Sequence, residues 1–462
     1  MLYIDNFERG ICMKRKIYDK LVKWKEESNG EVALLIDGAR RIGKSYIVEQ
    51  FAKEKYKSYI LIDFNKVGDD IKKLFENYLN DLDTLFMYLS SYYKVDLYER
   101  ESLIIFDEVQ LCPRARSAIK YLVADRRYDY IETGSLISIK KNVENILIPS
   151  EERHLYMYPM DFEEFLWAMG NNNLMNLIKK CFEEKKPLGQ LMHRQAMDYF
   201  KQYLIVGGMP QAVEKYINTR DFKEVDIIKR DIINLYKEDI VKYGGEDLNK
   251  IQSIFEEIPS QLQKHEKRFA FSSVDKNARY REYSGAFFWL QESMIVNIAY
   301  NTTEPNIGLR LNRESSALKC YIGDTGLLLS LAFDENGLMD EDIYKKILFD
   351  KLSFNEGMIM ENIVAQMIVA SGKKLYFYFN YDKENSENNM EIDFLIAKNK
   401  ITSKHNISPI EVKSGKNYTY SSLNKFKAKF KDYLYTNYIL HIDDLKEENE
   451  IVFLPLYMTC LL

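Results

Sequence analysis

The 462-residue chain has few of the residues that characterise fibrous, linker-rich or disulfide-stabilised proteins. Its 9 prolines and 20 glycines are too few for a collagen-like chain or a protein made of flexible linkers. Wide gaps in the sequence separate its cysteines, Cys12, Cys112, Cys181, Cys320 and Cys460. This spacing excludes a metal knuckle or a redox pair, and the odd number does not suit a disulfide framework. We therefore expect reduced, buried thiols.

Long apolar runs are also missing. No stretch approaches the roughly 20 apolar residues that a membrane-spanning helix requires. Residues 1–16 carry Asp5 and Glu8 and lack the apolar segment of a secretory signal peptide. We therefore expect a cytoplasmic protein that has no membrane partner.

The chain has no large excess of charge of one sign. Its 65 Lys and Arg residues against 70 Asp and Glu residues give a formal net charge of −5. Such a chain is not a general coat for nucleic acid, so a nucleic-acid surface would have to be a local patch. Hydrophobic residues, by contrast, make up 46% of the sequence, which is ample for buried cores. At about 150 residues per domain, the length predicts about three domains.

Changes in the period of apolar residues place the domain boundaries near residues 160 and 340. Short apolar runs in the first part lie at residues 31–37, 58–64, 103–106 and 128–132. Helical stretches separate these runs, which predicts an α/β domain with a parallel sheet over residues 1–160.

Residues 161–340 are mainly helical and end in a hairpin predicted for 294–300 and 318–322. A basic segment at 268–283 precedes the hairpin, an order that would suit a winged helix. DNA contact and structural packing between the flanking domains are both open roles for this unit. Asp324, in a turn after the hairpin, is expected to be a helix cap or a turn residue.

The third part, residues 341–462, again mixes helices and strands. Helices are predicted at 356–371 and 421–430, and strands at 374–379, 391–397, 408–413, 438–441 and from 451 onward. This pattern predicts a second, C-terminal α/β domain.

A phosphate-binding loop lies between the first apolar run and a helix. Gly38–Ser45 matches G-x-x-x-x-G-K-[ST], whose glycines let backbone N–H groups surround phosphate oxygens at a helix N-terminus. Lys44 would reach the β- and γ-phosphates of ATP, and the Ser45 hydroxyl would bind Mg²⁺. The residues expected to line the nucleotide are Gly38, Ala39, Arg40, Arg41, Ile42, Gly43, Lys44, Ser45 and Tyr46.

Two adjacent carboxylates, Asp107 and Glu108, end the third apolar run. Such a pair repels unless a cation lies near it. Asp107 would hold Mg²⁺, and Glu108 would polarise the water that attacks ATP. Thr133 and Ser135, after the fourth run, would contact the γ-phosphate or this water, unless they only form a polar turn. The acid pair suits activation of water and disfavours a small-molecule kinase.

These segments together resemble AAA-superfamily ATPases of bacteria and archaea. In that family the loop reads Gly-x-Arg-x-x-Gly-Lys, as Gly38–Lys44 does, and a strand ending Asp-Glu-x-Gln follows, here Asp107–Gln110. A Thr-Gly-Ser segment comes next, matched by Thr133–Ser135. The resemblance implies a P-loop NTPase fold and an ATP hydrolase in residues 1–160, and it also implies a winged helix in the middle.

An arginine extends the resemblance. Family members carry it just before a Pro-x-x-Phe-x-Glu-Phe segment. Here Arg153 precedes Pro159–Phe165, although Glu152 replaces the glycine that is often found before the arginine. The resemblance implies that Arg153 acts on the γ-phosphate, within one chain or from the neighbouring subunit of a homo-oligomer. A surface ion pair is the alternative, and the oligomeric state stays open.

A second set of acids lies in the C-terminal part. Glu411 and Lys413 share one face of a predicted strand, because side chains alternate along a strand. Asp393, on the preceding strand, can meet them, and Glu361 on the preceding helix can add a third carboxylate. Asp393 and Glu411 would then bind Mg²⁺ or Mn²⁺, while Lys413 activates water or steadies a phosphate.

This order of residues resembles the PD-(D/E)XK nuclease superfamily, in particular the nuclease-like domain fused behind ATPases of the kind described above. The resemblance implies DNA or RNA as a substrate. Residues 396–431 hold nine lysines and one acid, which would suit a phosphate backbone or a solvated helix face. A nuclease fold without chemistry, or a buried salt-bridge network, is the alternative.

Two functions follow. The first is an ATP-driven enzyme with a metal-dependent nuclease-like site that acts on or binds nucleic acid. The second is a nucleotide-dependent switch or scaffold whose C-terminal domain binds a partner without cutting. Metal binding at Asp393 and Glu411 would distinguish them.

Overall fold

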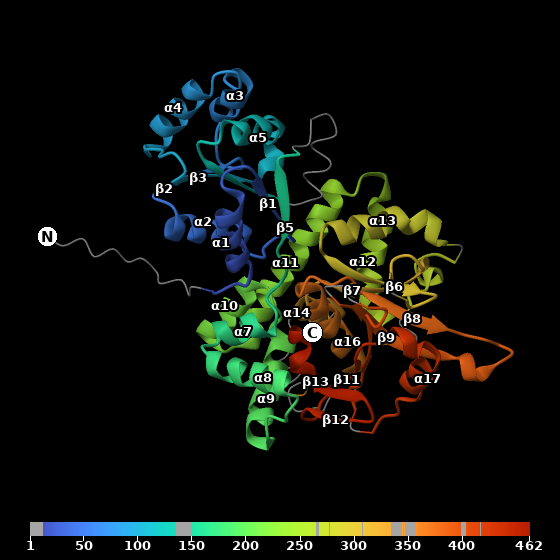
Figure 1. Cartoon of the computed structure of the whole chain (residues 1–462). Helices are drawn as coiled ribbons and strands as arrows, with labels where there is room; N and C mark the ends of the chain where they lie inside the picture. Colours follow the sequence, from blue (N-terminus) through green and yellow to red (C-terminus); the bar gives the residue numbers. More distant parts are fainter. Residues whose placement is uncertain are drawn as a thin grey trace.

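The structure is a computed structural model that contains two β-sheets joined by a helical region (Figure 1). It describes residues 13–134, 150–264, 268–276, 278–306, 308–333, 344, 346, 356–398, 403–415 and 417–462. Cys12 and Ser135 therefore lie outside the described residues. No helix within these ranges is long and apolar enough to cross a membrane.

The N-terminal sheet has five parallel strands in the order β2-β3-β4-β1-β5. Its strands are β1 (Ala33–Asp37), β2 (Ser58–Asp63), β3 (Ser102–Asp107), β4 (Asp129–Gly134) and β5 (Glu152–Tyr156). Every residue of β1, β3 and β4 is buried, as expected for apolar runs in a parallel sheet covered on both faces. The four predicted strands and the parallel α/β arrangement are confirmed.

Helices cover both faces of this sheet (Figure 1). They are α1 (Ile17–Ser28), α2 (Lys44–Lys55), α3 (Asp69–Asn77), α4 (Leu82–Tyr93) and α5 (Pro113–Asp125). Alternate residues of β1 point to opposite faces, so Leu34 joins the core that contains Phe51 of α2, while Leu35 joins the core that contains Phe75 of α3. Burying each such side chain contributes about 2 kcal/mol.

The middle of the chain is helical. Its helices are α7 (Phe162–Ala168), α8 (Asn172–Glu184), α9 (Gln190–Val206), α10 (Pro210–Thr219), α11 (Phe222–Tyr243), α12 (Leu248–Gln263), α13 (Tyr280–Glu292) and α14 (Thr325–Ala332). A capping box of Asp161 and Glu164 starts α7. The Asp324 carboxylate accepts a hydrogen bond from the Leu327 backbone at 3.0 Å, which confirms its predicted role as the cap of α14.

The C-terminal sheet has eight strands in the order β12-β13-β11-β10-β9-β8-β6-β7. They are β6 (Val296–Thr302), β7 (Arg313–Ile322), β8 (Tyr376–Asn380), β9 (Met390–Ala397), β10 (Ile407–Val412), β11 (Asn437–His441), β12 (Lys446–Glu448) and β13 (Ile451–Pro455). Helix α16 (Glu356–Ala370) packs on one face through Ile363, and α17 (Ser421–Phe430) packs on the other through Phe426.

The predicted hairpin is present as β6 and β7, but it is part of this sheet. β6 pairs in parallel with β8, with Tyr300 opposite Tyr376, so one sheet continues across the boundary predicted near residue 340. The hairpin is therefore an edge of the C-terminal sheet and does not project as a free wing. The winged helix and the division into three domains stay predictions.

Candidate functional site

The phosphate loop follows β1 directly, and its two glycines are required by the backbone. A Cβ atom at Gly38 would lie 2.6 Å from the carbonyl oxygen of Met157. Gly43 has φ of 88°, in the left-handed region that favours glycine, and Lys44 then begins α2. The loop therefore opens onto the N-terminus of a helix, the geometry that suits phosphate.

Lys44 is buried inside the loop. Its Nζ donates hydrogen bonds to the carbonyl oxygens of Gly38 at 2.9 Å and Ala39 at 3.0 Å. Burial lowers the pKa of Lys44, and the nearby carboxylates of Glu108 and Asp107 oppose this effect. The ammonium group thus already lies where it can meet phosphate oxygens.

Oxygen ligands for a magnesium ion meet beside this lysine. The Ser45 hydroxyl donates a hydrogen bond to Oδ1 of Asp107 at 2.8 Å, and the Thr133 hydroxyl donates to the same oxygen. Hydroxyl and carboxylate oxygens are ligands that Mg²⁺ prefers, so these residues fit the ion. Glu108 has φ of 52°, an uncommon conformation for a glutamate that is often found at functional sites.

Lys44, Ser45 and Glu108 line a cavity of about 500 Å³, which is large enough for a nucleotide, whereas Asp107 and Thr133 do not line it. Most of the predicted loop residues line it, together with Glu108. The lining residues are Met13, Arg15, Arg40, Arg41, Gly43, Lys44, Ser45, Tyr46, Glu108, Met157, Pro210, Gln211 and Glu214. Ser135 lies outside the described residues.

Arg153 lies within β5, opposite Leu34 of β1. Its side chain is 54% exposed, and its guanidinium group lies 3.8 Å from the carboxylate of Glu27. This position suits the surface ion pair that was the alternative interpretation, and its action on a phosphate stays a prediction.

A buried charge cluster lies on either side of Arg153. Glu152 accepts two hydrogen bonds from Arg116, at 2.6 and 2.7 Å, and it also contacts His154 at 3.1 Å. The other ring nitrogen of His154 lies 2.7 Å from Asp37. Hydrogen bonds to Asp37 and Glu152 raise the pKa of His154 to about 10, so the ring is protonated at neutral pH. Glu152, which replaces the glycine of the AAA pattern, therefore has a structural role.

The second predicted set of acids also comes together. Lys413 lies 2.7 Å from Glu411, and the backbone N–H of Val412 donates to Oδ2 of Asp393 at 2.8 Å. Burial raises the pKa of Glu411 to about 7, although Lys413 opposes the shift.

Sequence reasoning missed Lys319, which occupies the centre of this cluster. Its side chain is 1% exposed, and its Nζ lies 2.7 Å from Glu391, 3.8 Å from Asp393 and 3.9 Å from Glu361. Burial lowers the pKa of Lys319, but the three carboxylates outweigh that effect and raise it above its ordinary value. Lys319 comes from β7, far from the acids in sequence, so no local pattern could have revealed the contact.

The lysine changes what the acid cluster can bind. Its ammonium group supplies the positive charge that Glu361 and Asp393 would otherwise share with a divalent cation. Across the described residues, no group of three or more His, Cys, Asp or Glu side chains is arranged to hold a metal ion. Lys319 thus places an internal positive charge beside the acids that the sequence predicted to bind a metal.

Three models of protein families match successive parts of the chain. Residues 31–166 match an AAA domain, residues 197–338 match a domain of unknown function (DUF8612), and residues 356–458 match another (DUF4143). The first match includes the whole phosphate loop and both acids that end β3. The N-terminal region is an AAA-type ATPase domain. No curated protein matches the chain.

Several solved structures are distantly similar. The Walker-type ATPase of Pyrococcus abyssi is 14% identical over 69% of this chain and 95% of its own, with a TM-score of 0.40. The ORC1 protein of Aeropyrum pernix, solved in complex with DNA, is 10% identical over 71% of this chain and 95% of its own, with a TM-score of 0.26. AMPPCP-bound DnaA from Aquifex aeolicus is 11% identical over 60% and 89%, also with a TM-score of 0.26. Similarity this distant carries no conclusion about function.

Arg15, which precedes the residues that match the AAA model, connects the phosphate loop to Tyr158 and to α7. Its guanidinium group donates to the carbonyl oxygens of Ile42 at 3.0 Å and Tyr158 at 2.6 Å, and pairs with Glu164 at 3.2 Å. Sequence reasoning did not single out this residue, because one arginine at the start of a charged helix has no distinctive pattern.

Arg40 joins the loop of the AAA domain to α11. Its side chain pairs with Asp239 at 2.8 Å, and its carbonyl oxygen accepts a hydrogen bond from Tyr236 at 3.2 Å. The middle helices therefore contact the nucleotide loop directly.

Proposed function

We propose that the AAA domain binds ATP with Mg²⁺ and hydrolyses it to ADP and phosphate. The observation that carries this proposal is the contact between Ser45 and Asp107 beside a cavity that Lys44 and Glu108 also line. A cation-binding pair, a phosphate-binding lysine and a carboxylate for water meet there, which is the set that hydrolysis of a nucleotide needs.

Each residue has a role that its position allows. Lys44 would exchange its loop carbonyl partners for β- and γ-phosphate oxygens. Ser45 and Asp107 would hold the Mg²⁺ ion, which neutralises charge on the phosphates when bound. Glu108 would orient the attacking water and accept its proton.

The test compares Lys44→Ala with Lys53→Ala, an exposed lysine of the same helix that pairs with Glu49. Release of phosphate from radiolabelled ATP should fall at least about 100-fold in Lys44→Ala, because loss of a charged contact to the transferred phosphoryl group costs several kcal/mol. Lys53→Ala should match the unmodified protein. Equal turnover in Lys44→Ala would overturn the proposal.

We also propose that ATP controls the C-terminal domain and that this domain binds its target without cutting it. The contacts of Arg15 and Arg40 connect the nucleotide loop to α7 and α11, which gives ATP a route to the rest of the chain. The buried ammonium group of Lys319 among the acids supports binding without metal-dependent cleavage.

A metal-dependent nuclease is the competing function. The meeting of Asp393, Glu411 and Lys413 favours it, as does the nearby carboxylate of Glu361. The lysine-rich segment 396–431 does not add support for a nuclease. Its helical lysines bond within the domain: Lys425 and Lys427 donate to backbone carbonyl oxygens, and Lys429 donates to Tyr378.

Incubation with single- and double-stranded DNA and RNA, in Mg²⁺ or Mn²⁺, separates the two functions. We expect no cleavage by the unmodified protein, with or without ATP. Cleavage that disappears in both Asp393→Asn and Lys413→Ala would establish the nuclease and overturn the binding role.

A further inference from the structure

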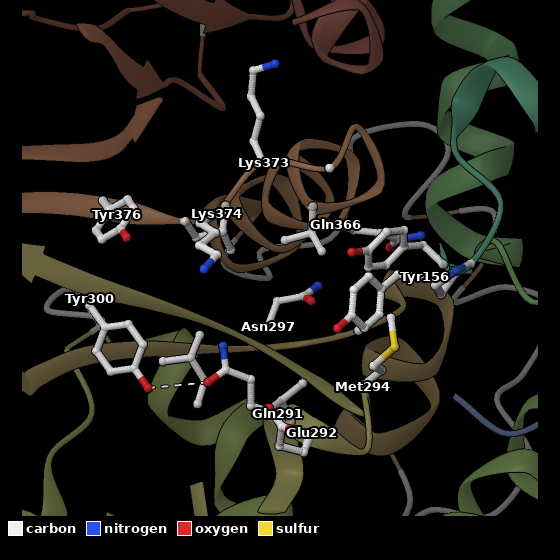
Figure 2. Close-up of a pocket in the computed structure, with 18 of the residues that line it drawn as sticks. Tyr156, Gln291, Glu292, Met294, Asn297, Tyr300, Gln366, Lys373, Lys374 and Tyr376 are labelled. Atoms are coloured by element: carbon white, nitrogen blue, oxygen red, sulfur yellow. Dashed lines mark hydrogen bonds between the residues drawn. The ribbon is translucent and has the colours of Figure 1, made fainter. Parts of the chain in front are cut away.

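A second cavity, of about 480 Å³, lies apart from the nucleotide loop. Three parts of the chain enclose it: the segment Tyr156–Pro159 that leaves the AAA domain, the region of α13, β6 and β7, and the connection between α16 and β8 (Figure 2). Its volume is that of a site for a small molecule. None of the residues assigned above to ATP or to the acid cluster lines it.

One end of this cavity is positively charged. Arg313 lies over the ring of Tyr300, 4.2 Å from its centroid. Burial raises the pKa of Tyr376, and the positive charges of Arg313 and Arg310, which line the same cavity, lower it. Figure 2 shows Lys374 reaching toward the same space between Tyr376 and Asn297. Three cationic groups therefore gather at this end, which would suit a phosphate.

The other end is aromatic and polar. Tyr156 lines it with a side chain that is 45% exposed, so its ring is accessible to a planar ligand. Glu292 lines the cavity together with Tyr156, whereas Gln291 accepts a hydrogen bond from Tyr300 at 3.4 Å (Figure 2). The amide of Gln366, which also lines the cavity, bonds to Thr325, Tyr203 and Asp324. An exposed tyrosine ring is a platform on which nucleic-acid bases stack, and the carboxylate of Glu292 can accept hydrogen bonds from the edge of a base.

We infer that this cavity binds a nucleoside phosphate, either free or at the end of a nucleic-acid strand. The phosphate lies between Arg310, Arg313 and Lys374, and the base lies against Tyr156. The cationic end matches the phosphate of a nucleotide, and the aromatic end matches its base. The volume of the cavity accommodates one nucleotide.

The segment Tyr156–Pro159 also separates this cavity from the ATP site. Tyr156 and Tyr158 line the second cavity, whereas Met157 between them lines the first. Adjacent side chains of an extended segment point in opposite directions, which explains this division.

Hydrogen bonds fix the same segment to the phosphate loop. The Met157 N–H donates to the carbonyl oxygen of Asp37 at 2.8 Å, and the Tyr158 carbonyl oxygen accepts from Arg15 at 2.6 Å. A ligand that orders Tyr156 thus acts on the backbone beside Gly38. This coupling rests on the proposed ATP hydrolysis, whereas the binding of the ligand does not.

The binding test uses the full chain with its ATP site saturated by AMPPCP. Fluorescence anisotropy follows a short labelled single-stranded DNA that carries a 5′-phosphate, and unlabelled AMP is added as a competitor. If AMP displaces the labelled strand, the ligand of the cavity is a free nucleotide. If the phosphorylated strand binds and AMP does not displace it, the ligand is the end of a nucleic-acid strand. Either result supports the inference, and failure of both to bind overturns it.

Variants locate the site. Tyr156→Ala should weaken binding about tenfold, because stacking on an aromatic ring contributes about 1–3 kcal/mol per base. Tyr156→Phe keeps the ring and should bind as the unmodified protein does. Arg313→Glu should also weaken binding at least about tenfold, because a charge-assisted contact to phosphate becomes a repulsion. Lys73→Glu, an exposed lysine of α3 outside the cavity, is the matched control for charge.

ATP turnover separates this inference from the proposed function. With the ligand present, we expect the rate of the unmodified protein to change at least about fivefold, the lower end of the coupling typical between two sites. Hydrolysis without any ligand binding would overturn only the inference. Binding without hydrolysis would overturn the proposed ATPase and leave the second site established. Equal binding by Tyr156→Ala, Arg313→Glu and the unmodified protein would place the ligand elsewhere.

Discussion

Two groups of carboxylates lie at strands of this molecule, and they meet different cations. Asp107 and Glu108 end β3 beside a 500 Å³ cavity, and their neighbours are the Ser45 hydroxyl and the ammonium group of Lys44. Asp393 and Glu391, on β9, instead face the buried ammonium group of Lys319. The first group has room for a metal ion and a phosphate, whereas the charge of the second is already balanced from within the protein. A buried lysine lies near each group of acids, so the open cavity beside Asp107 and Glu108 is what distinguishes the first group.

The largest expected effect is the loss of ATP hydrolysis when the Glu108 carboxylate of the first group is removed. Glu108→Gln should lower ATP hydrolysis about 100-fold, because loss of a group that orients and deprotonates water costs this much. ATP binding should persist, since Lys44 and Ser45 are intact, and calorimetric titration with AMPPCP would show it. Glu411→Gln is the matched change in the second group, and it should leave hydrolysis unchanged. A similar loss of hydrolysis in both variants would contradict the contrast between the two groups.

Removing the internal cation should have the largest effect on stability. Lys319→Ala leaves Glu361, Asp393 and Glu391 without their shared partner, and we expect the free energy of unfolding to fall by about 3 kcal/mol. Urea denaturation measures this change.

The same variant tests whether the acids can accept a metal. Mn²⁺ should restore part of the stability of Lys319→Ala but should not stabilise the unmodified protein. Lys404→Ala, which breaks an exposed pair with Asp432, is the control and should cost less than about 1 kcal/mol. Equal stability of both variants, with no effect of Mn²⁺, would show that Lys319 does not balance the cluster.

The acid beside Lys413 should make stability depend on pH. Burial raises the pKa of Glu411 from 4.5 to about 7, so between these values the folded state holds a proton that the unfolded state has lost. Stability should therefore fall as the pH rises from 4.5 to 7, by at most about 1.4 kcal/mol per pH unit. Glu411→Gln should remove this slope in denaturation curves. If stability depends on pH in the same way in the variant, a group other than Glu411 takes up the proton.

The smallest expected effect concerns His154 in the AAA domain. Hydrogen bonds to Asp37 and Glu152 raise its pKa from 6.5 to about 10, which stabilises the fold fully below pH 6.5. This contribution should be lost as the pH rises from 6.5 to 10, and solvent moderates it because the side chain is partly exposed. His154→Gln should flatten the stability profile in that window, as followed by thermal unfolding. A steeper profile in the variant would contradict the assignment.

The sequence was informative where function depends on neighbouring residues. The apolar runs predicted β1 to β4, and the motif Gly38–Ser45 includes several residues that line the 500 Å³ cavity, because these signals are local. β5 was not predicted, since the charged residues of Glu152–Tyr156 belong to an edge strand that is not apolar. Glu152 of this strand is buried by its contact with Arg116, and the sequence pattern does not reveal this contact between distant residues.

Contacts between distant segments account for what the sequence did not predict. Lys319 reaches the acids only because β7 and β9 share a sheet, and Arg15 reaches the phosphate loop only after α7 folds against it. The pairing of β6 with β8 likewise joins residues on either side of a boundary inferred from pattern alone.

That pairing has a consequence for how the chain can be divided. A fragment that begins at residue 341 would leave β8 as an edge strand with unpaired backbone groups from Tyr376 onward, a surface that promotes association between copies. It would also lack Lys319, so the acids near β9 would repel one another. The hairpin and the C-terminal strands thus form one structural unit, and a fragment that is to fold as this sheet must include residues on both sides of position 340.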